Sequence, residues 1–266
     1  SDNTAVGFQA LYSNTSGAGN TVMGHNAGFN VTTGQRSVAI GFQALDAATT
    51  GSDNVAVGYE AGGGITTGIE NTFLGYFAGA GTTTTDYNTA VGASALQANT
   101  TGAQNTAIGA KALDSNTTAN DNTALGYDSL TANTTGSNNV ALGHSTLKAN
   151  TTADSNVAIG RNALLVSTTG ASNVAIGSQA GDALTDASNS VFVGANAGGA
   201  VTTGSTNICI GISAGDTLTT GNTNILIGNT ARPSASGGAN QISMGVVVTC
   251  VGDNNFTFGN QSTDSN

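Results

Sequence analysis

The chain has 266 residues and a formal net charge of -10, from five Lys and Arg residues against fifteen Asp and Glu residues. This acidic balance argues against a surface for nucleic acid or for an anionic membrane. No stretch approaches the roughly 20 apolar residues that a membrane helix needs, and insertion into a membrane is therefore not expected.

Glycine recurs every 17 residues from the start of the chain almost to its end. The register begins with Gly7, Gly24, Gly41, Gly58, Gly75, Gly92 and Gly109 and continues to Gly245. A strict period of this size is typical of a solenoid, in which each unit buries its apolar side chains by stacking on its neighbours. These glycines are predicted to be structural, at the point where each repeat turns.

Each repeat opens with a short alternating segment, such as Asn3 to Gly7, which predicts a strand. The residue before each glycine is aliphatic or Met, and we expect this column to form the core. The preceding column is mostly Ala and is expected to face outward. The fold class is therefore all-β, a parallel β-roll or β-solenoid with one 17-residue coil per repeat and bends at the glycine and at Thr-Thr-Gly.

Each coil also supplies one large aliphatic side chain from one of two columns. Coils with Leu in the first column, as at Leu45, have a small or polar residue three positions later, whereas the coil with Gly62 has Ile65 there. Dense packing tolerates neither an empty slot nor two occupants, so both columns are expected to open onto one cavity. The coil with Gly79 and Thr82 supplies neither group, which predicts a local weakness or a contribution from Phe77.

Asn occupies the first column of most repeats, from Asn3 onward. Identical amides stacked at strand spacing are expected to hydrogen-bond along the solenoid, which we favour over a polar ligand site.

The two cysteines, Cys209 and Cys250, lie in different columns. We expect them to be isolated buried thiols and not a disulfide.

The column after the repeated glycine is the most varied and is rich in rings. Its candidate residues for contact with a receptor or glycan are Phe8, His25, Phe42, Tyr59, Tyr76, Tyr127 and His144. Exposed aromatic rings can stack on sugars. The interpretation we favour is that the rings stack on one another and shield the edge of the core.

Thr pairs recur before the second bend, for example Thr32-Thr33 and Thr49-Thr50. Flat Thr arrays on β-solenoids can bind ice, but adjacent residues of an extended segment face opposite ways. Ice binding is therefore the weakest functional hypothesis.

The 17-residue register fails after Gly245, because the next position in phase, Ser262, is not glycine. This predicts a β-roll over residues 1–245 and irregular C-terminal strands that end the repeats over residues 246–266.

The repeated motif resembles that of a known class of fibrous protein. Asn-Val-Ala-Ile-Gly at Asn156 to Gly160 and Asn-Thr-Ala-Val-Gly at Asn88 to Gly92 resemble head repeats of trimeric autotransporter adhesins. With Asn-Thr-Thr-Gly following, as at Asn99 to Gly102, they look still more like phage tail fibre repeats. The resemblance implies a left-handed parallel β-roll, three chains packed in parallel, and attachment to a cell surface. In similar phage proteins, such repeats precede a self-cleaving chaperone domain, whose removal here is a hypothesis.

A homotrimer is also expected from the residues, because an outer Ala-rich face would be exposed on a monomer and could be buried between chains. The expected function is the shaft or receptor-binding part of a viral tail fibre in the virion. The alternative is the head of a bacterial surface adhesin, located outside the cell. Expected partners are further copies of the chain, other fibre or virion proteins, and a host glycan or protein receptor.

No enzyme, metal site or cofactor is expected. His25 and His144 are seven repeats apart, and the Asp residues are dispersed. The glycine-rich runs lack the Lys-Ser or Lys-Thr of a phosphate-binding loop.

Overall fold

The computed structural model describes residues 2–259, and its regular structure is entirely β. The described residues form sixteen strands of three residues each and no helix. The chain divides into two compact units, Ser1–Ser137 and Asn138–Asn266. The predicted all-β solenoid of parallel strands with coils about 17 residues apart is confirmed.

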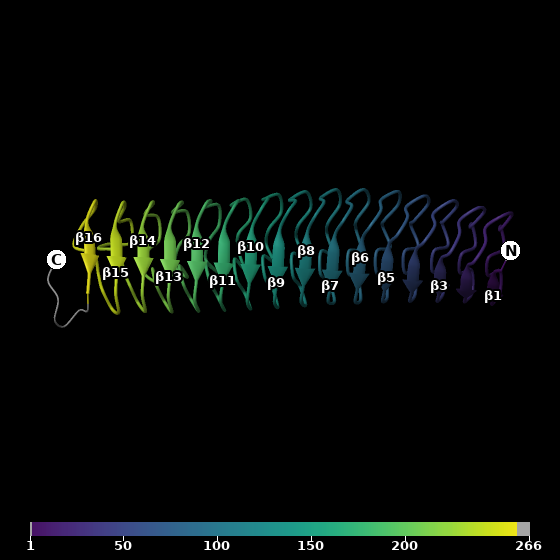
Figure 1. Ribbon diagram of the computed structural model, residues 1–266, viewed down its shortest axis with the longest axis horizontal. Helices are drawn as coiled ribbons and strands as arrows, with labels where there is room; N and C mark the ends of the chain where they lie inside the picture. The colour runs from purple at the N-terminus through teal and green to yellow at the C-terminus, as the bar shows by residue number, and fades with distance from the viewer. Residues whose placement is uncertain (1, 260–266) are drawn as a thin grey trace. The chain divides into compact units, whose positions relative to one another are not determined.

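In the first unit, consecutive strands pair in parallel and in sequence order (Figure 1). Residues 17 apart are partners, as Ala39 is of Ala56. The strands are β1 (Thr4–Val6), β2 (Thr21–Met23), β3 (Val38–Ile40), β4 (Val55–Val57), β5 (Thr72–Leu74), β6 (Thr89–Val91), β7 (Thr106–Ile108) and β8 (Thr123–Leu125).

The second unit repeats this parallel arrangement. Its strands are β9 (Val140–Leu142), β10 (Val157–Ile159), β11 (Val174–Ile176), β12 (Val191–Val193), β13 (Ile208–Ile210), β14 (Ile225–Ile227), β15 (Ile242–Met244) and β16 (Phe256–Phe258). The last coil is shorter, because Phe256 pairs with Ile242, 14 residues earlier. Gly259 then follows β16 as Gly245 follows β15, both with positive φ, whereas Ser262 lies outside the described residues.

The two faces of the strands are opposite to those expected from the sequence. The aliphatic column that we expected to be core is exposed or half-buried, with Val6, Met23 and Leu74 exposed by 53%, 49% and 38%. The Ala column is interior, with Ala39 and Ala56 almost completely buried. The prediction that the Ala-rich face lies outside and packs between chains is therefore wrong.

The narrow interior of the coil explains this inversion. A second Ala column, represented by Ala44 and Ala61, and the large side chains of the interchangeable columns, such as Leu45 and Ile65, are buried in the same interior. At close-packed density, a further large group on every strand would have no space. Only Ala fits in most coils, and the alternation of the strand then directs the aliphatic residues outward.

The coil that lacks both large aliphatic groups is filled by Phe73 of β5. The Phe73 side chain is fully buried. A Cβ atom added at Gly62 or Gly79 would lie 2.8 or 2.5 Å from its ring. Phe77, one of the two alternatives that the sequence offers for this coil beside a local weakness, is half-buried and packs edge-on against Tyr76. Phe77 therefore does not fill this coil, because Phe73 in the Ala column supplies the missing volume.

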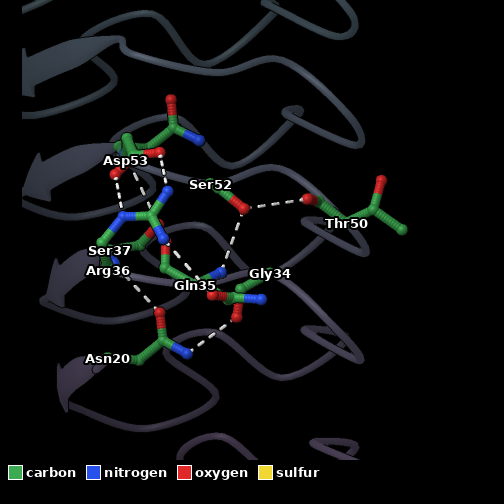
Figure 2. A network of polar contacts seen from close by, with 9 residues as sticks. Asn20, Gly34, Gln35, Arg36, Ser37, Thr50, Ser52 and Asp53 are labelled. Carbon is green, nitrogen blue, oxygen red and sulfur yellow. Dashed lines mark hydrogen bonds and ion pairs between the residues drawn. The ribbon is translucent and has the colours of Figure 1, made fainter. Parts of the chain in front are cut away.

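The Asn column forms the expected ladder of hydrogen bonds. Figure 2 shows Asn20, whose Nδ2 donates to the Gly34 carbonyl (2.9 Å) and whose Oδ1 accepts from the Ser37 amide (2.9 Å). Where Ser37 replaces Asn, its Oγ accepts from the Asn54 amide at 3.2 Å. Each such side chain satisfies buried backbone groups of the next coil, which confirms the structural interpretation of this column.

Both cysteines are free and buried, as expected. Cys209 occupies the interior Ala column, and burial raises the pKa of its thiol to about 12. Such a thiol is not ionised near neutral pH and is therefore a packing group.

Candidate contact surface

The first and third residues of each strand point away from the coil interior, and together they form what we call the outward face. In the first unit the first position is Thr or Val and the third position is an aliphatic residue or Met, as in Thr106 and Ile108 of β7. In the second unit β9 to β14 carry Val or Ile at the first position, as in Val174 of β11. None of the sixteen strands has a charged residue in either column. In each unit the outward face is thus an array of apolar and Thr side chains.

Five ring-bearing residues follow the strand-exit glycines of the first five coils and form a continuous stack, which we call the aromatic ladder. It consists of Phe8, His25, Phe42, Tyr59 and Tyr76. Successive ring centroids are 5.1, 5.3, 5.0 and 5.4 Å apart, and the interplanar angles are 26° or less. All five side chains are exposed, so the ladder is a ridge beside the aliphatic column of the outward face.

Stacking occupies the faces of the rings and leaves mainly their edges toward solvent. Phe77 packs edge-on against the end of the ladder. Its ring centroid lies 4.4 Å from that of Tyr76 at an interplanar angle of 82°, and 5.4 Å from that of Tyr59 at an angle of 72°. Stacking on a sugar requires an open ring face. The geometry therefore suits an edge-on packing surface better than a row of separate sugar platforms.

Tyr127 and His144, the other two candidate residues, lie further along the same column. Tyr127 belongs to the first unit and His144 to the second, and both are exposed. Ala93 and Ala110 occupy this column between Tyr76 and Tyr127. The structure therefore brings five of the seven candidate side chains into one described stack.

Both the backbone angle φ and the lack of space for a Cβ atom require glycine at the repeated position. Gly92 has φ of 133°, which favours glycine, and an added Cβ would lie 2.6 Å from the Gly109 carbonyl carbon. Gly7, Gly24, Gly41, Gly58, Gly75 and Gly109 have φ between 129° and 142°. Each of these glycines permits close contact between successive coils where the chain leaves the strand.

Charged groups lie beside the ladder but outside the two strand columns. The Tyr59 pKa is raised chiefly because its hydroxyl hydrogen-bonds to Glu60. Burial, and then the charge of Glu60, raises the pKa of Asp46. In another column Arg36 Nε and Nη2 each donate to the Asp53 carboxylate at 2.6 Å (Figure 2). This exposed pair joins successive coils and lowers the pKa of Asp53.

The paired threonines play two different roles. The first hydroxyl of each pair donates to the next coil, as Thr32 Oγ1 does to the Thr49 carbonyl at 3.0 Å. The second residue, such as Thr33 or Thr50, is exposed. Adjacent threonines thus present one outward row and not a two-dimensional array of hydroxyls.

The described residues contain no group of three or more His, Cys, Asp or Glu side chains arranged to hold a metal ion. A shallow depression of about 400 Å³ is lined by Gln97, Ala98, Asp114 and Ser115. Burial is the main cause of the raised pKa of Asp114 there. A single carboxyl group in an open depression suggests no particular chemistry.

Sequence reasoning missed the outward face because it placed the aliphatic column inside. One signal could have revealed it. If each coil receives one large group from the interchangeable columns, a second large group on every strand would overfill a small interior, although one coil buries both Phe192 and Val201. Phe73 supports this reading, because the strand supplies a large buried side chain in the coil where Gly79 and Thr82 leave the interior unfilled.

Comparison with known proteins does not assign the chain to a family. No protein family model matches it, and no curated protein sequence matches it either. Among the described residues, no helix has the length and apolar character to cross a membrane.

Proposed function

We propose that this chain is a non-enzymatic structural and attachment protein that forms the shaft or receptor-binding part of a viral tail fibre. The observation that carries this proposal is the outward face, which repeats the same apolar surface at every coil. A large exposed apolar surface marks a site of interaction. A surface that repeats with the coil suits assembly into a fibre, whereas catalysis requires one unique cluster of groups.

The proposal includes a homotrimer whose chains run parallel and contact one another through the outward face. The threefold arrangement and a left-handed winding are what the resemblance to adhesin and tail fibre repeats implies. The exposed Val, Ile, Leu and Met side chains supply the physical reason for association, because burial stabilises by about 25 cal/mol per Å² of apolar surface. This replaces the Ala-rich interface expected from the sequence.

Other fibre or virion proteins are proposed partners of the assembled chain, and the host receptor is a glycan or a protein on the cell surface. Contact with the receptor through flat stacking on the aromatic ladder is the less favoured version, because the ring faces cover one another. A spacer role, in which a neighbouring domain binds the receptor, fits the structure equally well.

The alternative is the head of a bacterial surface adhesin, for which the same outward face would serve the same assembly. Labelling with gold-conjugated antibodies against the chain, on virus particles and on the cells that carry the gene, separates the two. Label on fibres of the particle supports the tail fibre proposal, and label on the cell exterior supports the adhesin. Label confined to the cell interior would overturn both.

A further inference from the structure

A solenoid that assembles through a repetitive face must solve a problem of axial register. The outward residues of β6, Thr89 and Val91, differ little from Thr106 and Ile108 of β7. A neighbouring copy displaced by one coil would therefore meet an almost equivalent aliphatic surface. Strands with repetitive faces specify their pairing weakly and are prone to such slippage.

The aromatic ladder is the feature of this surface that changes abruptly along the first unit. Five consecutive coils carry Phe8, His25, Phe42, Tyr59 and Tyr76, and the next two carry Ala93 and Ala110 in the same column. The ridge thus has a bulky part of five coils and a low gap of two coils before Tyr127, at a fixed position along the stack. A copy displaced by one coil would place a ring where its neighbour offers Ala, and would leave one ring uncovered.

The rings of the ladder are also held in fixed positions by their packing against one another. Each ring is held by its neighbours at centroid distances of 5.0 to 5.4 Å, and Phe77 packs edge-on against the last two. Yet the side chains are far from buried, with Phe8 exposed by 65% and Tyr76 by 55%. Preformed aromatic side chains with large exposed area are typical anchors of protein interfaces.

We propose that the aromatic ladder sets the axial register between copies of this chain by packing against a second copy. This inference rests on the homo-oligomer proposed above. A second copy is the partner that fits, because side chains repeated at the strand spacing of about 4.8 Å are matched over many coils only by a surface with the same spacing. Despite the net charge of -10, the two strand columns carry no charge that would repel an identical face.

This role parallels the use of distinctive residues to fix register in repetitive assemblies. Coiled coils use a single unusual core residue to exclude shifted alignments of near-equivalent heptads. In this chain the distinction between aromatic and Ala coils serves the same purpose. The ladder thus determines which coils of two copies meet, while the aliphatic columns supply the general attraction.

Site-specific cross-linking tests the proposal. Chains with Thr89→Cys are mixed with chains carrying Thr123→Cys, refolded together and briefly oxidised. The two cysteines are two coils apart, about 10 Å along the stack, which exceeds the Cα separation of up to about 6.8 Å that a disulfide spans. Because Cys209 and Cys250 are buried, the unsubstituted chain serves as the blank. If the copies are in register, disulfides join only equal positions, 89 to 89 or 123 to 123, and we call these like links. Mass spectrometry of the linked peptides identifies which positions are joined.

Without the aromatic ladder, copies of the chain should still assemble, but their axial alignment should no longer be fixed. A variant with Phe8, His25, Phe42, Tyr59 and Tyr76 all changed to Ala is expected to keep its oligomeric mass and to lose most links between like positions. Copies displaced by two coils should also give links between positions 89 and 123. The matched control changes the stacked pair Tyr12 and Phe29, in a different column, to Ala and should keep the like links.

A second variant covers the case in which the first fails to fold. Ala93→Tyr with Ala110→Tyr extends the ladder without removing any ring and makes the column more uniform, so unlike links should increase. Unchanged like links in these variants would overturn the register proposal, as would an unmodified oligomer that gives no like links. A monomeric mass of the unmodified chain would instead overturn the proposed assembly itself.

Discussion

Phe73 occupies the space that Gly79 leaves in the interior of its coil. A Cβ atom at Gly79 would lie 2.5 Å from the Phe73 Cδ1 atom, so the two positions compete for one volume. In the coil that follows, Ala90 and Leu96 divide this volume the other way, and both are fully buried. In these two neighbouring coils the interior holds either a large strand residue with glycine or a small strand residue with Leu.

This exchange predicts a rescue experiment. Phe73→Ala should destabilise the protein by about 3–5 kcal/mol, as expected for an aromatic side chain removed from a core. Adding Gly79→Leu should recover part of this loss, because the Leu side chain refills the cavity. The recovery is reduced by about 1–2 kcal/mol, because Leu at this position must adopt a positive φ. Leu96 has φ of 54° and Gly79 has φ of 60°, so the backbone is suited to the change. Urea unfolding midpoints measure both effects.

Gly79→Leu alone provides the control for this exchange. With Phe73 present it should be strongly destabilising, because two large groups then occupy one volume. Equal destabilisation by Gly79→Leu with and without Phe73→Ala would show that the two positions are independent, contrary to the structure.

The buried Asn ladder should be sensitive to loss of a single amide. Asn105 donates from Nδ2 to the Ala119 carbonyl (2.8 Å) and accepts from the Asn122 amide (3.0 Å). Asn105→Ala leaves both backbone groups buried without this partner, and each should cost about 1–3 kcal/mol. Asn105→Ser should cost less, because Ser37 keeps the acceptor role at its own position. Chemical unfolding should rank the unmodified chain as most stable, Asn105→Ser next and Asn105→Ala last.

Gln97→Ala, at a half-buried amide outside the ladder, is the matched control and should change the unfolding midpoint little. An Asn105→Ala variant as stable as this control would show that the ladder does not stabilise the fold.

The sequence was sufficient to predict the period, the parallel coils, the Asn ladder and the buried thiols, because each depends on which residues share a column. It was not sufficient to decide which face of the strand is inside. Alternation places Ala56 and Val57 on opposite faces, but hydrophobicity alone favours the larger residue as core. The decisive quantity is the volume of the coil interior, which depends on how all the columns close around it.

The candidate site shows the same division. The shared column of Phe8, His25, Phe42, Tyr59 and Tyr76 was evident from the sequence, and stacking was the favoured interpretation. The adjoining aliphatic surface was not predicted, because its residues had been assigned to the core. The outer position of Val6 beside Phe8 became visible only once the chain path was known.

The strand-exit glycines should tolerate no side chain. Gly92→Ala introduces a Cβ 2.6 Å from the Gly109 carbonyl carbon, at φ of 133°, and should lower stability by at least about 1–3 kcal/mol. Gly252→Ala is the control, since an added Cβ there has no atom within 4 Å. Comparable thermal midpoints for the two variants would argue against close contact between successive strand exits.

Asp46 predicts a specific dependence of stability on pH. Burial and the charge of Glu60 raise its folded-state pKa above the ordinary Asp value of about 3.9. The folded state therefore binds this proton more tightly than the unfolded state does. The stability it contributes is fully present below the unfolded pKa and is lost as pH rises through the raised folded pKa.

Asp46→Asn should remove this loss while keeping an amide oxygen as acceptor. The variant should gain stability relative to the original chain as pH rises above about 4, and the gain should level off near neutral pH. Denaturant unfolding across this range measures the difference. A difference that does not change with pH would contradict the assigned role of the Asp46 charge.

The central claim is that the outward face joins copies of the chain, and sedimentation equilibrium of the full chain tests it most directly. We predict three times the mass of one chain, and a single-chain mass for the variant Ile176→Glu, which places a charge on this exposed column. A single-chain mass for the unmodified protein at micromolar concentration would contradict the account.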